Sequence, residues 1–102
     1  MRPIIKQFGF KFTQPPEGAV VLDCRVIPNP FGRGLADQVL LEKVRNHPSF
    51  AGVIQQGMQL IANNEVVWVG CLYGKHRSGA VAQTLAHLTG ASIQRIRQGV
   101  EA

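Results

Sequence analysis

Apolar residues in the first quarter of the chain follow two patterns that predict strands. Between Ile4 and Thr13, the side chains of Phe8, Phe10 and Phe12 fall at every second position, which predicts a strand with one buried face. The run Ala19–Cys24 is apolar until its end, as is typical of a strand buried on both faces of a sheet. A turn containing proline and glycine separates the two runs.

Later in the chain, apolar residues at helical spacing alternate with short apolar runs. Ser49 and Gly90 are the expected caps of two helices, one at the start and one at the end. Strands that alternate with helices favour an α/β fold with a mainly parallel sheet flanked by helices. The expected elements are helices over Leu35–Asn46, from the Ser49 cap to Asn63–Asn64, and over Ser78–Thr89, and strands over Val66–Gly70 and Ala91–Arg97.

Length and charge narrow the class of protein. With 102 residues, of which 45% are hydrophobic and 17% charged, the chain is expected to form one folded domain over residues 1–102. Eleven Lys and Arg against six Asp and Glu give a net charge of +5, which favours a polyanionic partner such as nucleic acid. No apolar run approaches the ~20 residues of a membrane span, and no signal peptide is recognisable, so we expect a cytoplasmic location without membrane contact.

The segment Val66–Gly79 predicts an anion-binding loop between a strand and a helix. Consecutive N–H groups in such a turn can surround an anion, and the helix that follows adds the positive end of its dipole. Gly74 permits the tight turn, and the planar guanidinium of Arg77 can bind two phosphate oxygens. The expected ligand-binding residues of this loop are Cys71, Leu72, Tyr73, Gly74, Lys75, His76, Arg77 and Ser78.

A second set of polar residues follows the other buried strand. If the two strands are parallel neighbours, Asp23 and Arg25 converge with the loop at the carboxyl edge of the sheet, where ligands of α/β proteins bind. Asn29, in the Pro-Asn-Pro segment that follows, joins this set. Asp23 can either form an ion pair with Arg25 or accept a hydrogen bond from His76.

The spacing Cys71-x-x-Gly74-x-x-Arg77-Ser78 also matches the signature of cysteine-dependent tyrosine phosphatases. In that alternative Cys71 is the nucleophile, Arg77 binds the phosphoryl group and Ser78 supports the thiolate. Gly70 replaces the usual His before the Cys, and the only upstream candidates for a general acid are Asp37 and Asp23. A small, buried and inert Cys71 is the competing interpretation.

Other cofactor chemistry is not expected. Gly70–His76 is one residue too short between its glycines for a nucleotide-binding P-loop, and His76 replaces the hydroxyl that would bind magnesium. Cys24 and Cys71 have neither zinc-type spacing nor a disulfide pattern. We therefore predict no metal and no cofactor.

Three motifs in order resemble one family over residues 4–97. They are Phe8-Gly9-Phe10-Lys11-Phe12, Asp23-x-Arg25-x-x-Pro28-Asn29-Pro30 and Gly70-Cys71-x-x-Gly74-Lys75-His76-Arg77-Ser78. Together they resemble the C-terminal domain of RapZ, the bacterial RNase adapter protein. The chain departs from the family at Phe31, where the family has His, and at Leu72-Tyr73, where it has Thr-Gly.

The resemblance implies an α/β module that binds small regulatory RNA and presents it to an endoribonuclease. It also implies that these motifs form a pocket for a phosphorylated amino sugar. From the anion-binding loop alone, free phosphate is the other candidate small ligand. The resemblance does not define whether the chain forms a homo-oligomer. Our first hypothesis is thus a non-catalytic RNA-binding adapter domain, and the phosphatase is the alternative.

Cations and aromatic residues supply the candidate RNA contacts. Tyr73, on the loop, can stack on a base, whereas core packing is the expected role of the three phenylalanines of the first strand. Phosphate contacts carry little sequence information, so recognition of RNA shape is expected. The candidate backbone contacts are Lys6, Lys11, Arg25, Lys75, Arg77, Arg95 and Arg97.

Overall fold

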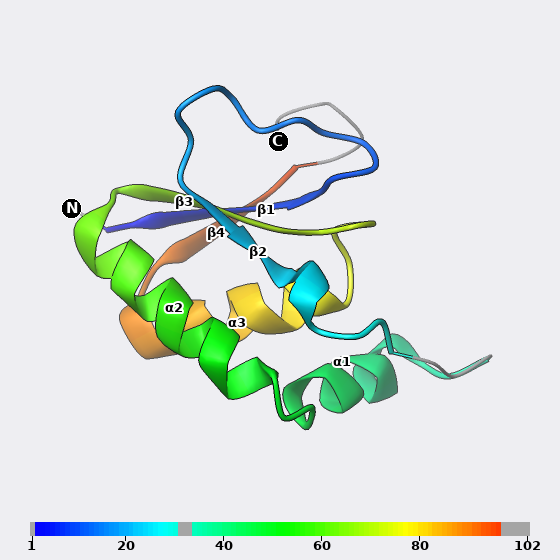
Figure 1. The fold of residues 1–102 in the computed structure, drawn as a ribbon. Coiled ribbons are helices and arrows are strands. Elements are labelled where there is room, and N and C mark those ends of the chain that lie inside the picture. Colours follow the sequence, from blue (N-terminus) through cyan, green and yellow to red (C-terminus); the bar gives the residue numbers. More distant parts are fainter. Residues whose placement is uncertain (1, 31–33, 97–102) are drawn as a thin grey trace.

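The computed structural model describes residues 2–30 and 34–96 as four strands, three α-helices and a short 3₁₀ helix (Figure 1). All strand pairs are parallel, in the order β2-β3-β1-β4, which confirms the predicted α/β fold. Among the described residues, no helix combines the length and apolarity needed to cross a membrane. The elements are β1 (Ile4–Gly9), β2 (Val21–Asp23), η1 (Cys24–Val26), α1 (Asp37–Arg45), α2 (Phe50–Asn63), β3 (Val66–Cys71), α3 (Arg77–Thr89) and β4 (Ser92–Arg95).

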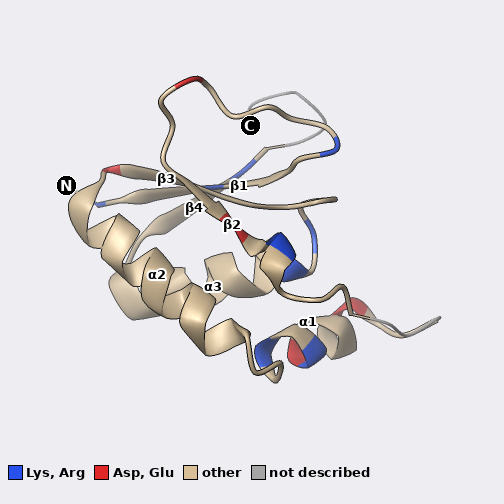
Figure 2. Ribbon diagram, viewed as in Figure 1, with Lys and Arg blue, Asp and Glu red and all other residues tan. Residues whose placement is uncertain are grey.

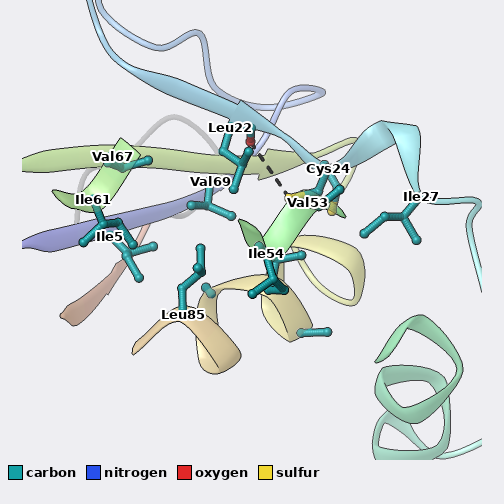
Figure 3. Packing of buried hydrophobic residues seen from close by; sticks show 14 of the residues in the cluster. Ile5, Leu22, Cys24, Ile27, Val53, Ile54, Ile61, Val67, Val69 and Leu85 are labelled. Atoms are coloured by element: carbon teal, nitrogen blue, oxygen red, sulfur yellow. Dashed lines mark hydrogen bonds between the residues drawn. The ribbon is translucent and has the colours of Figure 1, made fainter. Parts of the chain in front are cut away.

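The main hydrophobic core lies between the sheet and the helices, which Figure 1 shows on one side of the sheet. In Figure 3, Leu22 and Val69 of the sheet point toward Leu85 of α3 and the residues of α2. Gly57 allows α2 to approach closely, because a Cβ there would lie 2.7 Å from Leu85 and 2.9 Å from Leu22. This tight packing fixes α3, and with it the loop at its N-terminus.

The other face of the sheet carries a smaller aromatic cluster. The ring of Phe8 makes edge-to-face contacts with Phe10 and Trp68, at centroid distances of 4.7 and 5.6 Å. Phe8 also fills the space above Gly70, where a Cβ would lie 2.4 Å from the ring. The connection from β1 to β2 passes over this face (Figure 1). Core packing is therefore confirmed for Phe8 and Phe10.

The first two strands are shorter than predicted. β1 ends at Gly9 rather than Thr13, because the amides of Phe12 and Thr13 both donate to the Gly9 carbonyl at 3.0 Å and turn the chain. Phe12 is consequently 38% exposed, and the prediction that it packs in the core was wrong. β2 contains only Val21–Asp23, because the Asp23 side chain accepts from the Arg25 amide and starts η1.

Helix boundaries agree with the sequence patterns in part. Gly90 has a left-handed φ of 77° and ends α3, as predicted. Ser49 precedes α2 but makes no side-chain capping bond, and its amide donates instead to Nδ1 of His47 at 3.1 Å. The last strand is Ser92–Arg95, and the predictions for Arg97 and Phe31 fall outside the described residues.

Candidate anion-binding site

The β3–α3 loop, Cys71–Arg77, is held against the end of β1 by backbone contacts. The amides of Phe10 and Lys11 donate to the carbonyls of Cys71 and Leu72, each at 2.9 Å. The side-chain amide of Gln7, a buried group, donates to the Gly74 carbonyl at 2.9 Å. Three carbonyls of the loop are thus bound by β1 and the two residues that follow it, which hold the loop in place.

Gly74 is required at this contact for two reasons. Its φ is 75°, in the left-handed region that favours glycine, as the sequence predicted. A Cβ at this position would also lie 2.6 Å from the Gly9 nitrogen, and a Cβ on Gly9 would lie 2.6 Å from the Tyr73 carbonyl carbon. The two glycines therefore let the backbones of β1 and the loop touch.

The N–H groups that follow Cys71 in the loop, unlike three of its carbonyls, form no hydrogen bonds with the described part of the protein. Within residues 2–30 and 34–96, none of the amides of Leu72–Arg77 donates a hydrogen bond to a protein acceptor. The loop leads directly into α3, a helix of 13 residues whose first turn adds a positive dipole end. A run of available donors at a helix N-terminus is the arrangement that binds anions in other proteins.

The thiol of Cys71 contacts the start of α3. It donates to Ser78 Oγ at 3.3 Å and accepts from the Ser78 amide at 3.4 Å. The thiol of Cys71 is 2% exposed and Ser78 is fully buried. The contact between the two side chains, which the phosphatase alternative requires, is present, but the sulfur lies below the surface.

Arg77 links the loop to the end of β2. It is only 8% exposed, and its Nη1 donates to the Ile27 carbonyl at 3.2 Å. Strands β2 and β3 are parallel neighbours, as the convergence of the two polar sets required. Arg77 is also close enough to Asp23 for its charge to contribute to the lowered pKa of that carboxyl.

Asp23 and Arg25 form the predicted ion pair. Their side chains are joined by hydrogen bonds of 2.7, 3.0 and 3.2 Å. The hydrogen bond from Arg25 is the main cause that lowers the pKa of Asp23. The guanidinium also lies 3.8 Å from the centroid of Phe10, so the aromatic ring helps to position it.

His76 is bound by Asp37 and not by Asp23, which corrects the pairing considered from the sequence. Asp37, the first residue of α1, lies 2.9 Å from His76 Nε2 and 3.3 Å from Lys75 Nζ. The hydrogen bond with His76 and then that with Lys75 lower the pKa of Asp37. The sequence prediction missed this pairing because α1 is brought to the loop only by the tertiary fold.

A small polar cavity of about 130 Å³ lies beside the loop, toward β4. Lys75 and Arg95 bring two cations to its wall, and Gln7 contributes a side chain that is only 5% exposed. Gln7 was not predicted as a site residue, because its only signal in the sequence is a polar residue within an apolar strand. The complete lining is Gln7, Asp37, Leu41, Lys75, His76, Gly79, Gln83 and Arg95.

The remaining candidates lie at different distances from the loop. Figure 2 shows Lys and Arg at the turn after β1, at η1 and on the β3–α3 loop, all near the carboxyl ends of the strands. Lys11 belongs to this group, with its ammonium 4.9 Å from the centroid of Tyr73. Lys6 does not, since it lies over Trp68 on the face without helices, and Asn29 is an exposed loop residue.

The geometry of the fold and the comparison with known families together define the class of protein. The fold is a parallel α/β domain with an amide-rich strand-to-helix loop at its carboxyl edge, and the family model for the RapZ C-terminal domain matches residues 1–98. The chain belongs to the RapZ C-terminal domain family, as its three motifs predicted.

Two curated relatives show how much of a longer protein this chain represents. It is 32% identical over 111 residues to a nucleotide-binding protein of Pelobacter propionicus, covering 91% of this chain and 38% of that protein. It is 32% identical over 108 residues to a nucleotide-binding protein of Nocardia farcinica, covering 85% of this chain and 33% of that protein. The chain thus spans less than two fifths of the length of either relative.

Proposed function

We propose that this chain is a non-catalytic, RNA-binding domain of adapter type, whose β3–α3 loop binds a backbone phosphate. The observation that carries the proposal is the run of amides from Leu72 to Arg77, which have no protein acceptor within the described residues. The hydrogen bonds that hold the loop in place are accepted by its carbonyls. An anion could therefore bind the amides without breaking them.

The charge of the protein and the names of its relatives support RNA as the source of the phosphate. The net charge is +5, and cations at Lys11, Arg25, Lys75 and Arg95 surround or approach the loop. Such a surface binds a polyanion through several phosphates and releases counterions. The names of the relatives specify nucleotide binding for those proteins. A free phosphate or a phosphorylated amino sugar would use the same loop, and delivery of RNA to a ribonuclease extends the proposal beyond this chain.

A cysteine-dependent phosphatase is the second candidate, because Cys71 and Ser78 are in contact. Its chemistry lacks a suitable proton donor in the described site. The pKa of Asp23 is lowered mainly by its hydrogen bond with Arg25, and that of Asp37 by its hydrogen bonds with His76 and Lys75, so these carboxyls hold a proton poorly at neutral pH. Turnover of an aryl phosphate by the wild type that disappears in Cys71→Ser would establish this candidate and overturn the non-catalytic proposal.

The first test follows the loop directly. Titration of inorganic phosphate into ¹⁵N-labelled protein should shift the amide resonances of Leu72–Arg77 more than those elsewhere. Binding of a structured RNA should weaken steeply with salt, and Lys75→Ala should reduce the salt slope by about 1 with a uniform loss across sequences. Arg2→Ala is the matched control, because Arg2 precedes β1 at the opposite edge of the sheet.

Arg77 needs a conservative variant because it also binds the Ile27 carbonyl. Arg77→Lys keeps a cation and a donor but loses the fork that binds two oxygens, so it should reduce phosphate affinity while the protein remains folded. Binding that is insensitive to salt, or phosphate shifts outside the loop, would contradict the proposed function.

A further inference from the structure

Tyr73 is an exposed aromatic residue in the middle of the β3–α3 loop. It is 53% exposed, although the Lys11 ammonium lies 4.9 Å from its ring centroid and the Phe12 ring lies at 6.2 Å. Leu72, the chain neighbour of Tyr73, is 39% exposed, and Phe12, on the turn after β1, is 38% exposed, so three apolar side chains near the loop are left partly open to solvent. We call Lys11, Phe12, Leu72 and Tyr73 the aromatic platform.

The platform lies beside the donors described above, since the amides of Leu72 and Tyr73 belong to the same run. A ligand bound there meets a flat aromatic surface, an ammonium and a set of N–H groups together. A nucleoside phosphate has the complementary parts, namely a planar base with a π-face and a phosphate one sugar away. Stacking on aromatic side chains beside cations is the usual recognition of unpaired bases.

We propose that an unpaired nucleobase stacks on Tyr73 while its phosphate binds the β3–α3 loop. This inference rests on the proposed function, because it assigns a base to the phosphate that the loop holds. It identifies the preferred ligand as a nucleoside phosphate, either free or within a single strand. A sugar phosphate without a base has no group that uses the ring.

Charge complementarity favours this occupant over an apolar peptide. The ammonium of Lys11 is in cation–π contact with the platform itself, and Lys75 follows Tyr73 by two positions. Covering the Lys11 ammonium with an apolar partner would remove its hydration without supplying a counter-charge. A nucleoside phosphate supplies both the plane and the negative charge.

The chain offers a site-specific probe, because Tyr73 is its only tyrosine. Protein labelled with 3-fluorotyrosine carries a single ¹⁹F nucleus, at the platform. Adenosine monophosphate and a short single-stranded oligoadenylate should shift this resonance. Ribose 5-phosphate and an abasic oligonucleotide of equal length should shift the loop amides but leave the ¹⁹F signal almost unchanged.

Variants of Tyr73 measure how much base stacking contributes to binding. Tyr73→Ala should weaken binding of the oligoadenylate by about tenfold while binding of the abasic strand stays within about twofold, and Tyr73→Phe should retain wild-type affinity. Leu88→Ala is the control, since Leu88 is also 52% exposed but lies near the far end of α3. Circular dichroism of each variant confirms that it is folded.

The outcomes separate the two proposals. If base-bearing and abasic strands bind equally well and both shift the loop amides, the stacking inference is overturned and the phosphate site stands. If no ligand shifts the loop amides, the proposed function fails and the stacking inference fails with it. Binding of the strand without binding of the mononucleotide supports the inference and identifies single-stranded nucleic acid as the source.

Discussion

Two connections leave the carboxyl edge of the sheet side by side, and they are stabilised in different ways. The turn from β2 into η1 depends on an exposed ion pair between Asp23 and Arg25, which are two residues apart. The β3–α3 loop depends on close contacts with β1, namely the backbone contact between Gly9 and Gly74 and the hydrogen bond from the buried Gln7 side chain. Surface pairs contribute little to stability, whereas buried backbone contacts tolerate almost no change. The loop is therefore the more rigid of the two connections, and the turn is the more adjustable one.

Arg77 is where the two connections meet. Its hydrogen bond to the Ile27 carbonyl joins the start of α3 to the residue that follows η1. A ligand that engaged this guanidinium would act on both connections. The following predictions test the contrast between the rigid loop and the adjustable turn, in order of expected effect.

The largest effect is expected from Gly74→Ala. The new Cβ would meet the Gly9 nitrogen at 2.6 Å and would force a left-handed φ on alanine, so the free energy of unfolding should fall by about 3 kcal/mol or more. Urea denaturation measures the change. Gly18→Ala is the control, because Gly18 has a similar φ of 81° in open space and should lose only about 1 kcal/mol. Equal losses in the two variants would show that the contact with β1 does not hold the loop.

An intermediate effect is expected from Asp37→Asn. The carboxylate neutralises Lys75 and contacts His76, so its removal should raise the affinity for phosphate and for RNA by about two- to fivefold. Glu42→Gln is the control, since Glu42 lies on the same helix and pairs with Arg45. Isothermal titration at low salt measures both. Weaker binding in Asp37→Asn would mean that Asp37 positions the two side chains instead of competing with the anion.

The smallest effect is expected from the Asp23–Arg25 pair. Both side chains are more than 40% exposed, so a double-mutant cycle should give a coupling free energy far smaller than the loss expected in Gly74→Ala. The pair lowers the pKa of Asp23, so its contribution is present above the unfolded value of about 3.9 and is lost as the pH falls through the lowered value. Coupling as large as the loss in Gly74→Ala, or coupling that does not weaken on acidification, would contradict this contrast.

Local chemistry explains which features the sequence predicted. Gly74 and Gly90 were recognisable because glycine marks left-handed turns, and the Asp23–Arg25 pair because its members are close in the chain. The end of β1 was predicted too late, because the alternation of apolar residues continues through Phe12 after the backbone has already turned at Gly9.

Long-range contacts explain what the sequence did not reveal. The bond between His76 and Asp37 joins residues 39 positions apart, and it depends on where α1 begins in space. The partner of Arg77 is the Ile27 carbonyl, and a backbone acceptor leaves no signature in side-chain identities. In the sequence, Gln7 is only a polar residue within an apolar strand. The structure shows that its side-chain amide donates a hydrogen bond to the Gly74 carbonyl.

The packing of Phe8 over Gly70 makes the identities of these two residues interdependent. The ring occupies the volume that any side chain at position 70 would need, so even a methyl group there requires the aromatic to shrink or swing away. A relative with a histidine directly before the cysteine, as in the tyrosine phosphatases, should therefore carry a small residue at the position of Phe8. Packing on the face of the sheet without helices thus restricts which residues can precede Cys71 in the β3–α3 loop.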